Sequence, residues 1–387
     1  MRAMIMAAGV GSRLEPLTIN VPKPMVPVVN KPAMEHIIAL LRRHGITEVV
    51  ANLWYLPRHI EGYFGNGCDF GIKLRYSREA RLRGTAGGML AAKDLLLKDD
   101  GWDSRGATEK GPASGTFVLM AGDAVTGANL TRLIEFHKSR NALATIGLKR
   151  VDDVSGFGIV VTDGDGRILR FQEKPRPCQA DSDLANTMIY VFEPEVFEYI
   201  PPHGTPDFGR DIFPLLVREG VPFYGLALDE YWCDIGTLAK YHASHRDILL
   251  GKAGLALPGE EVMQGVFVCE GTELHRDAAL CPPVCIGGHV TIGKHATIGP
   301  YSVIGNRCEI GEGAIVRGSI VWNNTKVGQG ANLVDCVVGS DCYLAAGASL
   351  GEGVVLSDEC FVEEDSIIKR NVRIDPGRIV KRKVDNR

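Results

Sequence analysis

The sequence begins MRAMIMAAGVGSRLEPLT, residues 1–18, in which a glycine-rich turn follows an apolar run directly. The apolar run predicts a buried strand, and the turn after it carries Gly9 and Gly11. Glycines behind a strand leave backbone N–H groups open to a phosphate and permit its close approach. Arg13 and Lys23 follow in the same region. The stretch therefore predicts an α/β fold with a candidate phosphate-binding turn.

The two best-known phosphate motifs do not fit this turn. A dinucleotide fingerprint requires a third glycine at position 14, where this chain has Leu14, and a P-loop requires Gly-Lys-Ser/Thr. A merely structural turn stays open on the glycines alone. Arg13 and Lys23 add two fixed positive charges around the turn, which favours a triphosphate over the pyrophosphate of a dinucleotide.

Length and composition set the broad class of the protein. The chain has 387 residues, enough for two cores, with 45% apolar residues, 23% charged residues and a net charge of −4. These values exclude a polyanion-binding surface, so we expect no nucleic-acid partner. There is no apolar run of about 18 residues and no N-terminal signal pattern, which predicts a cytoplasmic protein without membrane contact.

The first 250 residues alternate apolar runs with amphipathic segments, which is typical of an α/β domain with a mainly parallel sheet. Strands are predicted at MRAMIMAA, EVVANLWY, IKLRYS, TFVLMA, ALATIGLK, GIVVT and TMIYVFE, and helices at PAMEHIIALLRRHG, RHIEGYFG and residues 86–97, 130–139 and 238–250. Residues 98–115 have no period and many Gly, Asp and Lys residues, so we expect an exposed loop there.

From Val268 onward, aliphatic residues recur every six positions, often followed by glycine. The period slips near Val327 and Leu333 and resumes at Val338. Such hexapeptides predict the sides of a parallel β-helix, and they resemble the left-handed β-helix family. Four positions after each aliphatic residue stand residues that are mostly small or β-branched and should point inward: Val290, Ala296, Ser302, Cys308, Ala314, Cys342, Ala348, Val354, Cys360 and Ser366.

The ten cysteines and the β-helix histidines have an ordinary interpretation. No CxxC pair or cysteine–histidine cluster has the spacing of zinc ligands, so we interpret most cysteines as packing residues. His289 and His295 occupy positions of the six-residue repeat that should face outward, where an exposed histidine is more frequent than a catalytic one.

Motifs along the first 250 residues resemble those of the sugar-1-phosphate nucleotidyltransferases. They are AAGVGSRLEPLT, PKPMVPVVNKP, GTAGG at Gly84, GD at Asp123, GFGIVV at Gly156, EKP at Glu173, NTMIYVFEP at Asn186 and WCDIGT at Trp232. The resemblance is greatest to the mannose-1-phosphate guanylyltransferase branch, in which a left-handed β-helix often follows. It implies a Rossmann-like nucleotidyltransferase domain with a mainly parallel mixed sheet at 1–250, a linker at 251–265 and the β-helix at 266–387.

The resemblance implies that a sugar 1-phosphate attacks the α-phosphorus of a nucleoside triphosphate and releases pyrophosphate. The attacking oxygen is already ionised, so catalysis reduces to positioning and charge neutralisation. Arg13, Lys23, Asp123 and Asp234 would be catalytic, and the two aspartates would hold Mg²⁺. The implied nucleotide-binding residues are Ala8, Gly9, Gly11, Ser12, Arg13, Lys23, Glu79, Gly84 and Thr85. The implied sugar-phosphate residues are Gly158, Glu173, Lys174 and Asn186.

Each role has a structural alternative that the sequence leaves open. Asp123 could begin a turn, Asp234 could cap the helix that starts near Thr237, and Glu173 with Lys174 could form a solvated turn. The chain also departs from the family pattern at two places. Leu82-Arg83 stands where relatives have Pro-Leu, and Met188 stands at a position that is usually glycine.

Glu79 leads to a prediction about the base. By the resemblance it faces the base edge, and a carboxylate can accept from guanine N1–H and N2–H together, which predicts GTP as donor and mannose 1-phosphate as acceptor. A solvated Glu79 is the alternative.

Three other functions also stay open. They are a glucose-1-phosphate thymidylyl- or uridylyltransferase, a bifunctional enzyme with acetyltransferase activity in the β-helix, and a regulatory or assembly subunit. Apolar residues outside the rungs, including Trp322 and Tyr343, predict a homo-oligomer that forms through the β-helix.

Overall fold

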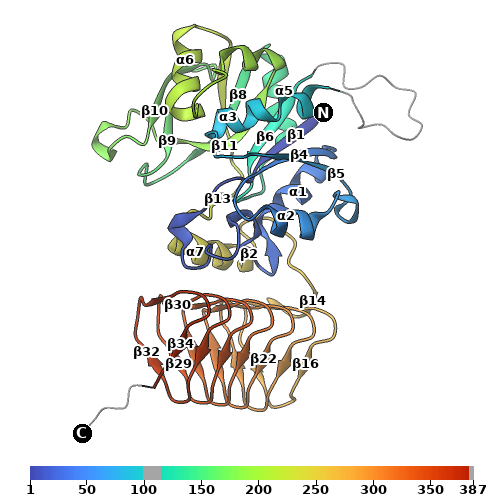
Figure 1. Cartoon of the computed structure of the whole chain (residues 1–387), viewed down its shortest axis with the longest axis vertical. Helices are drawn as coiled ribbons and strands as arrows, with labels where there is room; N and C mark the ends of the chain where they lie inside the picture. Colours follow the sequence, from blue (N-terminus) through green and yellow to red (C-terminus); the bar gives the residue numbers. More distant parts are fainter. Residues whose placement is uncertain (99–114, 383–387) are drawn as a thin grey trace. The chain divides into compact units, whose positions relative to one another are not determined.

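The computed structural model describes residues 1–98 and 115–382, so most of the loop predicted at 98–115 lies outside the described residues. The chain forms two compact units (Figure 1). The first comprises Met1–Val10 and Ala33–Asp234, and the second comprises Gly11–Pro32 and Ile235–Arg387. The domain limits predicted at residues 250 and 266 stay a prediction. None of the helices that the structure describes is long and apolar enough to cross a membrane.

A nine-stranded mixed sheet forms the centre of the first unit, in the order β10-β9-β11-β6-β1-β4-β5, with β8 beside β11 and β12 beside β8. The strands are β1 (Arg2–Met6), β4 (Glu48–Leu53), β5 (Lys73–Arg78), β6 (Phe117–Ala121), β8 (Ala144–Arg150), β9 (Gly158–Thr162), β10 (Ile168–Glu173), β11 (Leu184–Phe192) and β12 (Phe223–Ala227). Strands β5, β4, β1 and β6 are mutually parallel, whereas β11 pairs antiparallel with β6, β8 and β9. The predicted mixed α/β sheet is confirmed.

The central parallel strands β1 and β6 are almost entirely apolar, as is typical of parallel strands covered by helices, whereas β5 at the sheet edge carries charged and partly exposed residues. The helices of this unit are α1 (Ala33–Arg43), α2 (Pro57–Phe64), α3 (Thr85–Ala91), α4 (Lys93–Leu97), α5 (Leu130–Ser139) and α6 (Phe213–Arg218). Helix α5 has the predicted limits, and Asn129 caps it by accepting from Arg132 N at 3.0 Å. The helical segment predicted near 86–97 is present, but it consists of two helices, α3 and α4. Ala92, at φ −90° and ψ 0°, separates α3 from α4, so the periodic pattern continues across a turn.

An aromatic cluster beneath the sheet fixes the segment that precedes α6. The rings of Phe208 and Phe213 stack at 5.5 Å, and both contact the ring of Tyr190 on β11. All three side chains are fully buried or nearly so. Phe208 begins the single π-turn Phe208–Ile212, which leads directly into α6. This packing holds the backbone around residue 207 firmly against the sheet.

The β-helix of the second unit consists of three parallel sheets, stacked coil on coil (Figure 1). One contains β15 (Val266–Val268), β18 (Val284–Ile286), β21 (Ser302–Ile304), β24 (Ile320–Val321), β27 (Val337–Val338), β30 (Val355–Leu356) and β33 (Arg373–Ile374), with β14 (Glu260–Met263) antiparallel at its edge. A second contains β16 (Glu273–Leu274), β19 (Thr291–Ile292), β22 (Glu309–Ile310), β25 (Lys326–Val327), β28 (Tyr343–Leu344), β31 (Phe361–Val362) and β34 (Ile379–Val380). The third contains β17 (Ala279–Leu280), β20 (Thr297–Ile298), β23 (Ile315–Arg317), β26 (Asn332–Val334), β29 (Ser349–Leu350) and β32 (Ile367–Ile368).

The register of these sheets explains the slip in the sequence period. Val284 pairs with Ser302, whereas Ile304 pairs with Val321, so the coil that starts at Ile304 is one residue shorter than the coil that starts at Val284. The longer step returns where Val337 pairs with Val355. The predicted left-handed β-helix is confirmed, and every residue predicted to point inward is buried.

The interior cysteines behave as packing residues. Every cysteine in the chain is a free thiol. Burial raises the pKa of the Cys308 and Cys336 thiols to about 12, so both stay protonated and unreactive at neutral pH. His289 and His295 are exposed on outer turns, as predicted.

The second unit also contains helix α7 (Leu238–Leu249) and the Gly11–Pro32 segment. This segment forms the short helical turns η1 (Ser12–Leu14) and η2 (Lys23–Met25) and a hairpin of β2 (Pro27–Val28) and β3 (Lys31–Pro32). Thr237 caps α7 by accepting from Lys240 N at 3.3 Å. Helix α7 agrees with the helix predicted at 238–250.

Candidate functional site

The carboxyl ends of β1, β5 and β6 bring several predicted site residues to one edge of the first unit's sheet. Ala8 and Gly9 follow β1, Glu79 follows β5 and Asp123 follows β6. Gly9 is exposed, and a Cβ placed on it would meet no atom within 4 Å. Its backbone is therefore open to a ligand, at the edge where α/β sheets bind ligands.

Glu79 lies in a buried hydrogen-bond chain rather than in solvent. Its Oε1 accepts from Asn52 Nδ2 at 2.7 Å, and its Oε2 accepts from the Arg83 backbone N–H at 3.1 Å. Asn52 Oδ1 in turn accepts from Ala7 N at 2.8 Å. Only 8% of Glu79 is exposed. The chain ties the end of β1 to the loop that precedes Gly84, and the solvated alternative for Glu79 is wrong.

Gly84 and Thr85 begin α3 against a second segment, residues 205–211. Gly84 has φ +77°, and a Cβ on it would lie 2.5 Å from Pro206 O, so no other residue fits there without a shift. Thr85 Oγ1 donates to Asp207 Oδ2 at 2.8 Å and accepts from Phe208 N at 2.9 Å. The threonine hydroxyl thus holds the two segments together.

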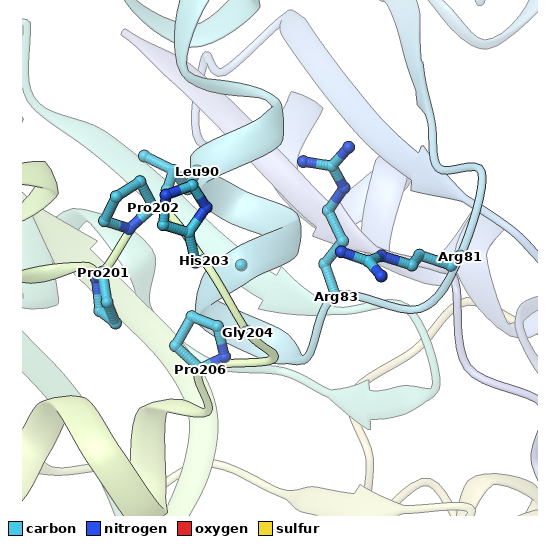
Figure 2. A pocket seen from close by; sticks show the side chains of 9 residues that line it. Arg81, Arg83, Leu90, Pro201, Pro202, His203, Gly204 and Pro206 are labelled. Carbon is cyan, nitrogen blue, oxygen red and sulfur yellow. The ribbon is translucent and has the colours of Figure 1, made fainter.

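A cavity of about 220 Å³ lies on the flank of α3 (Figure 2). Arg81 and Arg83 approach it from the loop before α3, and Pro201, Pro202 and His203 approach it from the opposite chain segment. Gly87 lines this cavity, whereas the next residue, Gly88, faces Asn52 and Glu79. Arg83, one of the two departures from the family pattern, therefore gives this hollow a positive charge.

Asp123 and Asp234 lie at one end of a two-stranded ribbon of β7 (Ala124–Thr126) and β13 (Trp232–Asp234), with Asp123 in the turn directly before β7. Asp234 is the direct cross-strand partner of Ala124, the residue after Asp123. The backbone N–H of Gly122 donates to Met6 O at 3.0 Å, which fixes the turn before Asp123 beside the end of β1. Carboxylates are hard oxygen ligands, and Mg²⁺ is usually bound by one or two of them together with substrate phosphates. This pair fits such a cation.

The four predicted sugar-phosphate residues are brought together on β9, β10 and β11. Gly158 and Glu173 are cross-strand partners, and Lys174 Nζ lies 3.2 Å from Glu173 Oε1. Asn186 follows Ala185, which pairs with the residue after Gly158. Asn186 Nδ2 donates to Tyr190 Oη at 2.8 Å, which orients the amide. Met188 has φ +58°, which explains why glycine is usual at that position.

Asn52, Tyr190 and Asp207 belong to this region and were not predicted. Asp207 Oδ1 accepts from Gly209 N and Arg210 N, and a Cβ on Gly209 would lie 2.3 Å from Glu173 Oε2. The residues around Asp207 therefore connect Thr85 to Glu173. Asn52 could have been found in the sequence, because it is a polar residue inside the apolar run EVVANLWY. Asp207 gives no such signal.

The remaining predicted residues belong to the second unit. Gly11 has φ +76°, and the Cβ of Lys23 lies 2.8 Å from where a Gly11 Cβ would be. Ser12 and Arg13 lie on η1 and are exposed, whereas Lys23 is only 9% exposed. The structure thus packs the lysine stem against the second glycine of the turn, and only glycine suits that position.

The side chains of the β-helix also bear on the metal-ligand pattern considered from the sequence. Within residues 1–98 and 115–382 there is no group of three or more His, Cys, Asp and Glu side chains that could hold a metal ion. His289 and His295 stand at turns with φ of 55° and 56° on the outside of the coils.

Comparisons with known proteins agree with this architecture. A family model described as nucleotidyl transferase matches residues 2–250, and one described as the LbH domain of the EIF2B epsilon subunit matches residues 263–368. A UTP–glucose-1-phosphate uridylyltransferase from Synechocystis sp. is 40% identical over 83% of this chain and 82% of its own length. A mannose-1-phosphate guanylyltransferase from Mycobacterium tuberculosis is 31% identical over 74% of this chain and 79% of its own length.

A solved structure supports the fold. A proposed glucose-1-phosphate thymidylyltransferase from Bacillus anthracis superposes with a TM-score of 0.54 at 24% identity, over 63% of this chain and 93% of that one. At this identity the likeness concerns the fold alone.

Proposed function

The chain belongs to the nucleotidyl transferase family as a sugar-1-phosphate nucleotidyltransferase, and from that premise we propose that its substrates are UTP and glucose 1-phosphate. The observation that carries this choice is the 40% identity to the uridylyltransferase from Synechocystis sp., against 31% for the guanylyltransferase from Mycobacterium tuberculosis. Both relatives cover most of this chain, so the comparison concerns the whole architecture.

The surroundings of Glu79 weaken the argument for guanine. Guanine needs both oxygens of the carboxylate for its N1–H and N2–H donors. In this chain each oxygen already accepts from a protein donor, Asn52 or Arg83, and the side chain is almost fully buried. We therefore assign Glu79 to holding the loop before Gly84.

In the proposed reaction a phosphate oxygen of the sugar 1-phosphate forms a bond to the α-phosphorus of the triphosphate. The bond from that phosphorus to the bridging oxygen breaks, and pyrophosphate leaves with the electron pair. No proton has to be removed from the ionised phosphate, so the chain has to align the substrates and neutralise charge. Arg13 and Lys23 meet the triphosphate, and Lys174 meets the sugar phosphate. Gly158, Glu173 and Asn186 contact sugar hydroxyls.

Asp123 and Asp234 are the residues that would hold the divalent cation, and Mg²⁺ is the proposed one. When bound, this ion supplies charge neutralisation at the phosphate oxygens. The pairing of Asp234 with Ala124, the residue after Asp123, supports the assignment. Their side chains are half-buried, so the carboxylates keep access to a ligand.

GTP with mannose 1-phosphate is the second candidate. Guanylyltransferases recur among the relatives, for example a probable one from Arabidopsis thaliana that is 31% identical over 73% of this chain. A carboxylate oxygen has a second lone pair, so Glu79 retains some capacity to accept from guanine.

Pyrophosphate release tests the two candidates directly. The purified full-length chain is given UTP, GTP, dTTP, ATP or CTP, each with glucose 1-phosphate or mannose 1-phosphate, and Mg²⁺. The proposal expects the highest kcat/KM with UTP and glucose 1-phosphate. A preference for GTP and mannose 1-phosphate would replace it by the second candidate, and no turnover with any pair would favour a regulatory or assembly subunit.

A further inference from the structure

The two cationic turns of the Gly11–Pro32 segment form one compact body. Thr18 Oγ1 donates to Gly11 O at 3.0 Å, and the stem of Lys23 fills the space beside Gly11. Arg13 on η1 and Lys23 on η2 are thereby held in one local arrangement. The position of this body then depends on what holds the segment from outside, and in the second unit that is α7 and the β-helix.

The first anchor is a direct hydrogen bond from a β-helix coil. Ser357, the residue after β30, donates from Oγ to Pro16 O at 2.9 Å. Ser357 is fully buried, and Pro16 lies three residues after Arg13. The same carbonyl accepts from Ile19 N at 3.3 Å within the segment. Ser357 therefore supplies the external hydrogen bond next to the predicted triphosphate-binding arginine.

The second anchor is a relay of two hydrogen bonds. Trp322 Nε1, from the coil after β24, donates to Tyr241 Oη at 2.9 Å, and Tyr241 on α7 donates to Pro27 O at 2.6 Å. Trp322 is 2% exposed and Tyr241 is fully buried. Pro27 lies four residues after Lys23. The earlier interpretation of Trp322 as an oligomer contact is therefore wrong, because its ring and N–H are used inside the chain.

The hairpin between β2 and β3 gives a third anchor. Its turn residues Val29 and Asn30 both have positive φ, 46° and 66°, which is a strained conformation for valine. Val29 N donates to His245 Nε2 at 3.1 Å, and Asn30 Nδ2 donates to Ile304 O at 2.8 Å. Contacts with α7 and with β21 thus hold the hairpin turn.

We propose that the β-helix positions the segment that carries Arg13 and Lys23 for triphosphate binding, and that Ser357 and Trp322 are its positioning residues. The inference rests on the proposed role of those two cations. Neither Ser357 nor Trp322 touches substrate. Ser357 acts directly on the Pro16 carbonyl, whereas Trp322 acts on the Pro27 carbonyl through the Tyr241 hydroxyl. Loosening these two points lets the cations leave the arrangement that binds the triphosphate.

The test compares two double variants of the full-length protein. Ser357→Ala with Trp322→Phe removes the hydrogen bonds donated to Pro16 O and to Tyr241 Oη, and leaves the Asn30 contact with Ile304 O in place. Ser302→Ala with Thr325→Val is the matched control, because these buried side chains also donate to carbonyls, at Val316 and Gly339, but only within the β-helix. The readouts are KM for the nucleoside triphosphate, KM for pyrophosphate in the reverse reaction, and amide hydrogen exchange over residues 11–32.

One net hydrogen bond lost at each anchor corresponds to about a 5-fold effect, so the anchor variant should raise both KM values about 25-fold. Amide exchange over residues 11–32 should also become faster. The control should leave both KM values within about two-fold of wild type, although it loses more hydrogen bonds, since Thr325 Oγ1 also accepts from Cys342 N. Equal changes in the two variants, or no change in the anchor variant, would overturn the proposal.

Arg13→Ala separates this inference from the proposed function. If Arg13→Ala raises the triphosphate KM and the anchor variant does not, only the positioning role fails. If Arg13→Ala has no effect, the assigned role of the cation fails, and hydrogen exchange still decides whether the anchors hold the segment.

Discussion

Replacing Glu79 by Gln distinguishes a structural anchor from a base-reading residue. Three donors meet three acceptors in the chain Ala7 N–H, Asn52 amide, Glu79 carboxylate and Arg83 N–H, in which the hydrogen bonds of Ala7 and Asn52 are buried and that of Arg83 is partly buried. A glutamine offers one oxygen and one NH₂ group, so its NH₂ must face Asn52 Nδ2 or Arg83 N–H. Turning the Asn52 amide over does not help, because its Nδ2 would then face Ala7 N–H. One donor is left unpaired in every arrangement.

An unpaired buried donor costs about 1–3 kcal/mol, or a factor of about 5 to 150 in an equilibrium constant. Glu79→Gln should therefore unfold at a lower urea concentration than wild type. It should lose kcat/KM with UTP and GTP by similar factors, because the loop before Gly84 is loosened for both. Glu61→Gln is the matched control, since Glu61 also accepts through both oxygens, from Arg78, but at the surface. Unchanged stability together with a GTP-to-UTP ratio altered by more than about 10-fold would refute the anchor role.

Three further predictions follow from other parts of the chain. Asp123→Asn and Asp234→Asn should each lower turnover about 100-fold or more with the circular dichroism spectrum unchanged, and near-normal turnover in either would remove that residue from the metal site. The rings of Tyr343 and Phe361 are 46% and 39% exposed and stack at 5.2 Å. The double variant Tyr343→Ser with Phe361→Ser should therefore lower the particle mass in light scattering more than Ile315→Ser does, because Ile315 lies on another face of the β-helix. An unchanged mass in the double variant contradicts the predicted homo-oligomer. Burial raises the pKa of Asp358 to about 6, so the carboxyl favours folding below about pH 4 and this contribution to stability is lost as the pH rises through 6. Asp358→Asn keeps the acceptor for Ser340 N, and it should unfold like wild type near pH 4 but be up to about 3 kcal/mol more stable at pH 7.5. A difference in stability that does not depend on pH would exclude this cause.

The fold was predictable because the two halves of the sequence have different patterns of apolar residues: alternating strand and helix segments first, and a six-residue repeat after Val268. The six-residue period after Val268 reports which side chains face the interior of the β-helix, and burial of the stacked small residues confirms it. The limits of α5 were predictable because Asn129 caps a regular amphipathic segment. The break at Ala92 was not, because the apolar pattern continues on both sides of a turn that only the backbone angles reveal.

The candidate site was predictable where a residue belongs to a local motif and not where a partner is distant in sequence. Gly158, Glu173 and Asn186 lie in recognisable motifs, and the structure brings them to neighbouring strands. The hydrogen bonds of Glu79 were not predictable, because Asn52 reaches it from another strand. Nor was the use of Trp322, whose partner on α7 is 81 residues away along the chain.

Residues 205–211 show why such distant partners matter for substrate choice. Pro206 O accepts from the N–H groups of Ala86 and Gly87, while Gly209 lies against the Glu173 carboxylate. The predicted nucleotide loop and the predicted sugar residues thus share one packed segment, which the Phe208 and Phe213 rings fix to the core. Because packed cores deform little, a change that moves this segment alters both subsites together. Selectivity for the nucleotide and for the sugar is therefore expected to be coupled in this chain, and neither can be assigned to a single residue such as Glu79.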